Sequence, residues 1–62
     1  MPLIEVKLYD HRVNDETAKA IVEKLTDALC DAVTQDQAFR DAIMVVVEGV
    51  PRQHWGTAGV QH

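Results

Sequence analysis

The hydrophobic and polar positions along the chain form three successive patterns, and the first is an alternation near the amino terminus. Within residues 3–9, Ile4, Val6 and Leu8 share one face, and the residues between them form a mixed face. A period of two is typical of a β-strand with one buried side. The pattern therefore predicts a strand over residues 3–9.

The second pattern, with steps of three and four residues, occupies residues 15–33. Its apolar members are Ala18, Ile21, Leu25, Ala28, Leu29, Ala32 and Val33. This spacing predicts an amphipathic helix. Asn14 is a suitable amino-terminal cap, and Asp15 and Glu16 place negative charge where the helix dipole is positive. Cys30 lies beside the stripe, where we expect it to act as a small packing residue.

The third pattern is a nearly continuous apolar run over residues 42–48. Such a run indicates a strand that is covered on both faces, and a single helix can cover only one of them. The preceding residues 34–41 are polar except for Phe39, which we expect at the edge of the core, and they leave room for a short extra helical turn. We expect residues 49–51 to end the strand.

These patterns together predict an α+β fold, in which a β-α-β unit with parallel strands is followed by a C-terminal hairpin or loop. Gly56 and Gly59 flank small residues and favour a tight turn. We predict a single domain over residues 1–62. Because an isolated two-stranded sheet is not stable in water, the uncovered strand face should be buried by other copies of the chain.

Composition also favours self-association. A chain of 62 residues is short for a stable core, and small domains usually rely on disulfides, metals or partners. Cys30 is the only cysteine, and the three histidines lack a metal-ligand spacing, so we expect neither a disulfide nor a metal site. With 47% hydrophobic residues, the chain can support association with itself.

Charge and hydropathy exclude two other classes of partner. The formal net charge is −4 with only six lysines and arginines, which argues against nucleic-acid binding. No apolar run approaches transmembrane length and no signal-peptide pattern is present, which argues against a membrane protein. The unpaired cysteine suits a reducing compartment, so we expect a cytoplasmic protein.

Candidate chemistry begins at Pro2, which directly follows Met1. Removal of Met1 would leave Pro2 with a free secondary amine at the start of a strand. An α-amino group titrates near about pH 8, and an apolar pocket lowers its pKa towards neutrality because desolvation disfavours the cation. Pro2 could then act as a general base. If Met1 is retained, Pro2 is an amide and cannot do this chemistry.

Three features in a chain of this length resemble the 4-oxalocrotonate tautomerase family. They are Pro2 within Met-Pro-Leu-Ile-Glu-Val, Arg12 after the first strand, and Trp55-Gly56-Thr57-Ala58-Gly59 after the second. The resemblance covers nearly the whole chain. It implies a small β-α-β protein that assembles, often as a homohexamer, with active sites at protomer boundaries. It also implies a cofactor-independent keto–enol tautomerase.

The resemblance further implies roles for individual residues. Pro2 would move a proton between carbons of a small anionic enol or keto acid. Arg12 would bind or polarise the carboxylate or carbonyl end. Trp55 matches an aromatic position that makes the pocket apolar, and Tyr9 falls where well-known members carry leucine, so we expect both to contact substrate.

The chain also departs from the family pattern. His11 replaces a glycine, and Ile43 stands where well-known members have a second arginine. Arg40 and Arg52 are candidates to replace that arginine, and His54 is a further candidate to contact substrate.

Two alternative functions remain open from the sequence. In the first, Pro2 stays protonated and acts as an acid in hydration, dehalogenation or decarboxylation of a small unsaturated or oxo acid. In the second, Met1 is retained and the chain is a non-catalytic oligomeric binding protein.

Overall fold

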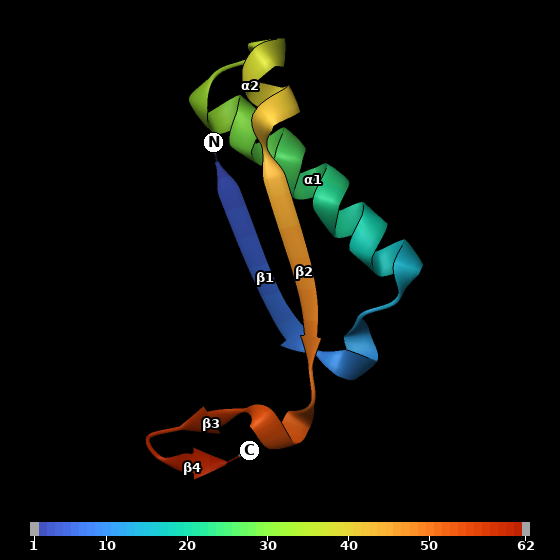
Figure 1. Cartoon of the computed structure of the whole chain (residues 1–62), viewed down its shortest axis with the longest axis vertical. Helices are drawn as coiled ribbons and strands as arrows, with labels where there is room; N and C mark the ends of the chain where they lie inside the picture. Colours follow the sequence, from blue (N-terminus) through green and yellow to red (C-terminus); the bar gives the residue numbers. More distant parts are fainter. Residues whose placement is uncertain (1, 62) are drawn as a thin grey trace.

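The computed structural model describes residues 2–61, and its elements follow the predicted β-α-β order (Figure 1). They are β1 (Leu3–Tyr9), the 3₁₀ turn η1 (Asp10–Arg12), α1 (Asp15–Val33), α2 (Gln37–Ala42), β2 (Met44–Val50), the 3₁₀ turn η2 (Arg52–His54), β3 (Gly56–Thr57) and β4 (Val60–Gln61). β1 and β2 pair in parallel, whereas β3 and β4 form an antiparallel hairpin. The predicted α+β fold with a C-terminal hairpin is therefore confirmed.

The first strand and the long helix have the predicted bounds. The Asn14 side chain caps α1, because its Oδ1 accepts a hydrogen bond from the backbone N–H of Thr17 at 2.9 Å. Asp15 and Glu16 lie in the first turn of α1. Local sequence signals are therefore sufficient to set where this helix begins.

The bounds predicted for the second strand are wrong at both ends. Ala42 ends α2, which begins after Asp36, whose side chain accepts a hydrogen bond from the N–H of Ala38 at 3.1 Å. With this cap, the six residues Gln37–Ala42 form a helix that is longer than the short turn predicted from the sequence. At the other end, Gly49 and Val50 do not interrupt β2, because they pair with the last two residues of β1.

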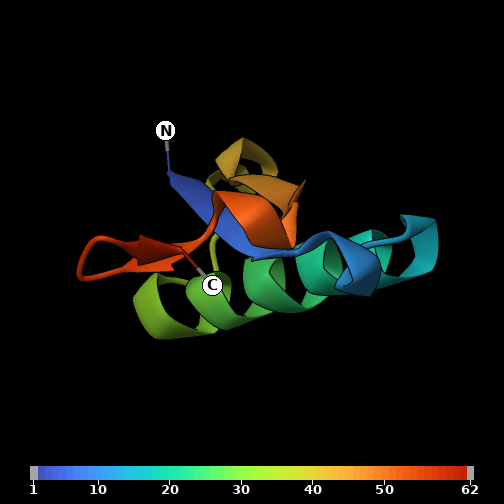
Figure 2. The same cartoon turned by 90° about the horizontal axis from the view of Figure 1, so that it is seen from below.

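The two-stranded sheet is covered on one face only. Figure 2 shows α1 lying along one side of the sheet. The side chains of Ile4, Val6 and Leu8 are half-buried on this side, as the alternation predicts. Leu3, Met44 and Val46 belong to the opposite face, with exposed fractions of 54%, 49% and 47%. No element within residues 2–61 covers this second face.

The molecule is more extended than a compact chain of its size. Its radius of gyration is 14.3 Å and its extents are 43 × 26 × 15 Å, whereas a compact domain of this length has a radius of about 10.6 Å. Its accessible surface is 4841 Å², against about 4000 Å² expected for a compact monomer of 6.9 kDa. Among residues 2–61, only Cys30 is buried, with 7% of its surface exposed.

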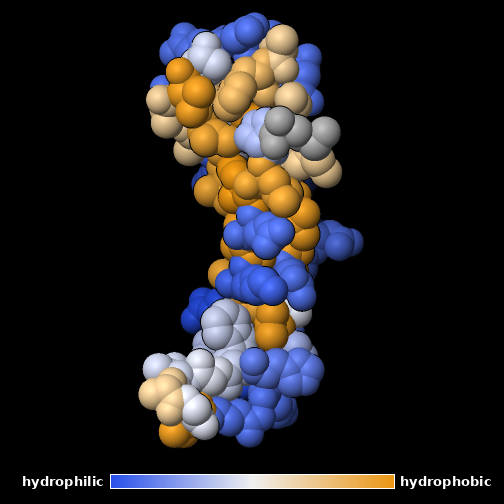
Figure 3. Space-filling model, turned by 60° about the vertical axis from the view of Figure 1, so that its left-hand side comes forward, coloured by the Kyte–Doolittle hydropathy of each residue, from blue (hydrophilic) through white to orange (hydrophobic). Residues whose placement is uncertain are grey.

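Apolar surface gathers on the side of the molecule where β1 forms the edge of the sheet (Figure 3). A groove of about 430 Å³ runs between β1 and α1 there, lined by Val6, Leu8, Thr17, Ala20, Ile21, Lys24 and Leu25. A hydrophilic band crosses the same view below the apolar area. On the open sheet face, the Lys7 Nζ and Glu48 Oε1 atoms lie 3.6 Å apart as an exposed ion pair.

The C-terminal hairpin extends away from the β-α-β body (Figure 1). Its turn residues Ala58 and Gly59 have φ angles of 54° and 83°, the left-handed pair that a two-residue hairpin loop requires. The side chain of Gln61 donates a hydrogen bond to the carbonyl of Gln53, which ties β4 back to η2.

Candidate functional site

The sequence-predicted site residues divide between the two ends of the β1–β2 sheet. Pro2 is half-buried at the amino end of β1, where its carbonyl accepts a hydrogen bond from the N–H of Met44 at 3.0 Å. This bond fixes the start of β1 against the start of β2. Tyr9, Arg12 and Trp55 all lie at the opposite, carboxyl end of the sheet.

Arg12 is carried by the tight turn η1 directly after β1. The carbonyl of Asp10 accepts a hydrogen bond from the N–H of Val13 at 3.1 Å, which closes the turn. The Arg12 side chain is exposed, and it makes no ion pair with any residue that the structure describes. Its charge is therefore available to a ligand.

Gly49 allows η1 to approach the end of β2 closely. A Cβ atom built on Gly49 would lie 3.1 Å from the Asp10 Cα and 3.4 Å from the Val13 Cβ. A side chain at position 49 would thus require η1 to shift. The glycine that we expected to break the strand instead lies within it and sets the distance to the turn that carries Arg12.

Three rings meet at the carboxyl end of the sheet. The ring centroids of Tyr9 and Trp55 lie 4.9 Å apart with a tilt of 52°, and those of Tyr9 and His11 lie 6.0 Å apart and nearly parallel at 19°. The indole N–H of Trp55 donates to the carbonyl of Val50 at 3.1 Å, which anchors the ring to the end of β2. We call Tyr9, His11 and Trp55 the aromatic cluster.

The end of the molecule around the aromatic cluster is rich in basic residues although the chain as a whole is acidic. η1 carries His11 and Arg12, and η2 carries Arg52 and His54. Asp10 is the only carboxylate in the two turns. This charge distribution suits an anionic ligand.

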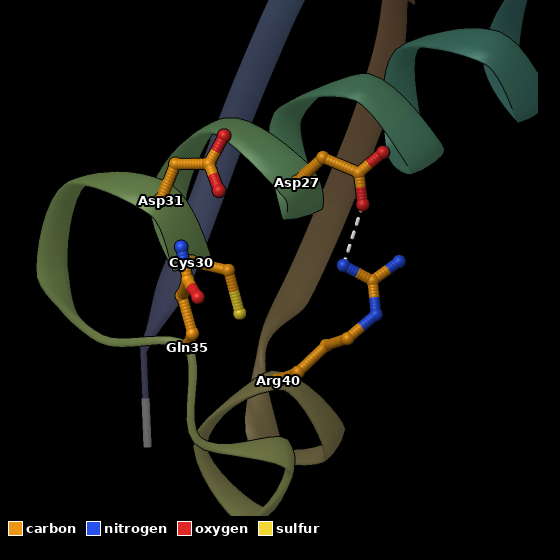
Figure 4. Close-up of a pocket in the computed structure, with 5 residues that line it drawn as sticks. All are labelled: Asp27, Cys30, Asp31, Gln35 and Arg40. Carbon is orange, nitrogen blue, oxygen red and sulfur yellow. Dashed lines mark hydrogen bonds and ion pairs between the residues drawn. The ribbon is translucent and has the colours of Figure 1, made fainter.

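The amino end contains a hollow of about 340 Å³ between α1 and α2, lined by Asp27, Cys30, Asp31, Gln35 and Arg40 (Figure 4). The Arg40 Nη1 and Asp27 Oδ1 atoms lie 2.5 Å apart. The hydrogen bond and charge of Asp27 raise the pKa of Arg40 above its ordinary value. Arg40 is thus already paired with a carboxylate of its own chain, whereas Arg12 has no such pair among residues 2–61.

The structure brings Tyr9 and Trp55 into contact, with Arg12, Arg52 and His54 in the adjacent turns. It does not bring Pro2 to them within one chain. Tyr9 is the seventh residue after Pro2 along the strand, or about 23 Å away at about 3.3 Å per residue. A single copy of the chain therefore cannot place Pro2 beside Arg12 and Trp55.

Sequence reasoning gave no role to His11 or Asp27, and it gave Gly49 only the role of a strand breaker. Tyr9 and His11 are two residues apart, a spacing that places side chains on the same face of an extended chain, so the sequence did contain a signal for the contact between their rings. The partner of Arg40 had no such signal, because Asp27 is 13 residues away on another helix.

Among the helices within residues 2–61, none combines the length and the apolar character that a membrane span needs.

Comparison with known proteins agrees with this architecture. The family model for tautomerase enzymes matches residues 2–61. A probable tautomerase of Ralstonia nicotianae is 42% identical over 60 residues, covering 97% of this chain and 80% of that protein. The 2-hydroxymuconate tautomerase of Comamonas testosteroni is 37% identical over 60 residues, covering 97% of this chain and 89% of the relative.

Solved structures give the same result. A structure of the 4-oxalocrotonate tautomerase isozymes from Methylibium petroleiphilum superposes with a TM-score of 0.76 and is 30% identical, covering 97% of this chain and 90% of that one. A small β-α-β unit with a C-terminal hairpin, matched over residues 2–61, defines an isomerase of the tautomerase type. The chain belongs to the tautomerase enzyme family.

Proposed function

We propose that this tautomerase interconverts the keto and enol forms of a small anionic α-keto acid without a cofactor. The observation that carries the proposal is the family match over residues 2–61, which starts at the proline that Met1 removal would expose. In the proposed reaction, the neutral Pro2 amine takes a proton from a carbon or an enol hydroxyl group of the substrate. The prolinium then returns the proton to another position.

Arg12 orients the substrate in this proposal. A guanidinium group can pair with a carboxylate through two parallel hydrogen bonds, which fixes the ligand in the plane of the pair. Support comes from the exposed Arg12 side chain, which makes no ion pair among residues 2–61. Trp55 excludes water from the amine in the same site, so that the amine pKa falls towards neutrality.

The site in this proposal is shared between protomers. Pro2 and the aromatic cluster lie at opposite ends of one sheet, so Pro2 of one copy must meet Arg12 and Trp55 of another. The uncovered sheet face with Leu3, Met44 and Val46, and the large surface of the isolated chain, support such an assembly. We propose a homohexamer, and a cytoplasmic location.

Subunit mixing tests the proposal most directly. Pro2→Ala and Arg12→Ala should each be inactive alone on the enol form of phenylpyruvate or on 2-hydroxymuconate. Unfolding and refolding the two together should restore about a quarter of the wild-type activity, because half of the sites receive an intact Pro2 and half of those an intact Arg12. A mixture of two inactive variants that stays inactive would place both residues of each site on one chain. Variants that are each active alone would place neither residue in the site.

Two further measurements separate this function from its alternatives. The intact mass of the purified protein must show the loss of Met1, because retention makes Pro2 an amide and leaves only a binding role. The pH–rate profile must lose activity as pH falls, since the base has to be neutral. Loss of activity as pH rises would instead assign Pro2 the role of an acid in hydration, dehalogenation or decarboxylation.

A further inference from the structure

His11 stands where the family pattern has a glycine, so the pattern gives its side chain no role. Its imidazole lies nearly parallel to the Tyr9 ring, at 6.0 Å between centroids and 19° between planes. Tyr9 in turn contacts Trp55, which is anchored by its hydrogen bond to Val50. His11 thus extends an existing pair of rings into a surface of three.

The position of His11 in the chain connects this surface to the candidate carboxylate-binding group. His11 and Arg12 are neighbours within η1, and the turn is closed by the Asp10–Val13 hydrogen bond. His11 is exposed, and its recorded ring contact is with Tyr9. A ligand held at Arg12 would therefore bind to the same turn that carries the His11 ring.

The chemistry of the two groups specifies the ligand. Arg12 can bind a carboxylate, and aromatic rings pack against flat unsaturated groups in offset or tilted geometry. A short aliphatic acid can use only the first of these contacts. An acid with an aryl group conjugated to its carboxylate can use both.

We propose that His11 is a specificity-determining residue that makes the site prefer aryl-substituted acids to short aliphatic acids. The proposal rests on the proposed function, because it requires that Arg12 binds the carboxylate. Contact between His11 and the ligand ring acts through ring stacking. His11 discriminates between substrates in this role and transfers no proton to them.

The test uses the only indole signal of the protein. Trp55 is the single tryptophan, so its indole N–H gives one resonance in a ¹⁵N NMR spectrum of the assembled protein. The probes are trans-cinnamate and crotonate, which share a carboxylate and a conjugated double bond and differ by a phenyl group in place of a methyl group. The measured quantity is the ratio of their two Kd values.

We expect His11→Gly to reduce the preference for cinnamate by about fivefold, as one lost aromatic contact requires, while the crotonate Kd stays within about twofold. His11→Phe should restore the preference because it keeps a ring without a titrating group. His11→Leu, which has similar bulk but no ring, should behave like His11→Gly. This set separates ring stacking from charge and from a loosened turn.

An unchanged ratio in His11→Gly, or restoration by His11→Leu, would overturn the role of His11. Wild-type protein that binds neither acid would overturn it as well. Failure of the proposed function looks different, because it appears as missing turnover or as unchanged Kd values for both acids in Arg12→Ala. The preference can therefore fail while turnover and the dependence on Arg12 stand.

Discussion

The two ends of the β1–β2 sheet use their arginines in opposite ways. At the amino end, Arg40 is paired with Asp27 at 2.5 Å and joins α2 to α1. At the carboxyl end, Arg12 lies in a turn beside three rings and makes no ion pair with residues 2–61. The paired Arg40 links two helices, whereas the exposed Arg12 is available to a ligand.

Each end of the sheet also supplies only some of the residues of the proposed site. The amino end supplies Pro2, held by a backbone hydrogen bond to Met44, but it brings no aromatic ring of the cluster. The carboxyl end supplies rings and basic groups, but it lies at the far end of β1 from Pro2. Each end is half of the proposed site, and association of copies is the means of joining them.

Replacing the amine at the amino end should have the largest effect. We expect Pro2→Ala to lower kcat/KM for enol-to-keto conversion by about a thousandfold, because a positioned general base contributes between a hundredfold and ten-thousandfold. Steady-state kinetics on the enol of phenylpyruvate measures this, and circular dichroism serves as the control for folding. Full activity in Pro2→Ala, or in protein that retains Met1, would exclude the mechanism.

Removing the unpaired cation at the carboxyl end should have the second largest effect. We expect Arg12→Ala to lower kcat/KM about a hundredfold, since a charge-assisted pair contributes about 3 kcal/mol. Folding should hardly change, because Arg12 is exposed. Lys19→Ala is the matched control, since it removes a positive charge from the exposed side of α1. Equal activity of the two variants would return Arg12 to the role of a surface charge.

Opening the aromatic cluster to water should change the pH dependence of the amine at the other end. In Trp55→Ala, the cation of Pro2 becomes easier to solvate, so the amine pKa should rise by about one unit. The acid limb of the pH–rate profile should move to higher pH by the same amount, because a higher pH is then needed for the neutral base. NMR titration of Pro2 checks this, with Trp55→Phe as the control that keeps the pKa low. An unchanged pKa in Trp55→Ala would remove Trp55 from the site.

A smaller effect should follow from crowding the turn that carries Arg12. A methyl group at Gly49 meets the Asp10 Cα at 3.1 Å, so Gly49→Ala should displace η1 and raise KM by about fivefold with little change in kcat. Gly59→Ala is the control, because its φ of 83° strains only the hairpin turn and its Cβ would meet open space. Thermal unfolding of both variants shows how much stability each loses, which separates backbone strain in the hairpin from displacement of η1. A raised KM in Gly59→Ala alone would contradict the role given to Gly49.

Breaking the ion pair between Arg40 and Asp27 should have the smallest effect on activity and stability. Asp27→Asn removes an exposed ion pair, so we expect only a slight loss of stability that shrinks further at high salt. The raised pKa of Arg40 means that its contribution is complete below its ordinary pKa and is lost only as pH rises through the higher folded value. The difference in Tm between wild type and variant should therefore stay constant between about pH 7 and 9. A loss of activity as large as that of Arg12→Ala would instead give the amino end a role in substrate binding.

Elements with a strong local signal were predictable from the sequence. The alternation of Ile4, Val6 and Leu8 and the cap at Asn14 gave β1 and α1 with their correct bounds. The second strand was predicted too early, because the apolar character of residues 42 and 43 outweighed the helix cap at Asp36. The sequence predicts a strand end at Gly49, but this residue lies within β2, where its missing side chain allows the strand to pass the turn at Asp10.

The site was predictable only as a set of residues. The roles expected for Pro2, Arg12, Tyr9, Trp55, Arg40, Arg52 and His54 stay predictions. Contacts such as Tyr9 with Trp55 join segments far apart in sequence, and they depend on the parallel pairing that brings residue 9 beside residue 50. The partner of Arg40 depends on how α2 docks, which no local pattern encodes.

The open sheet face has a consequence for how the chain responds to dilution. With only Cys30 buried among residues 2–61, little of the free energy of folding can come from contacts within one chain. If copies bury Leu3, Met44 and Val46 against one another, folding and association become one equilibrium governed by mass action. The midpoint of thermal denaturation should then rise with protein concentration, and a highly diluted sample should lose its helical signal without any change of solvent.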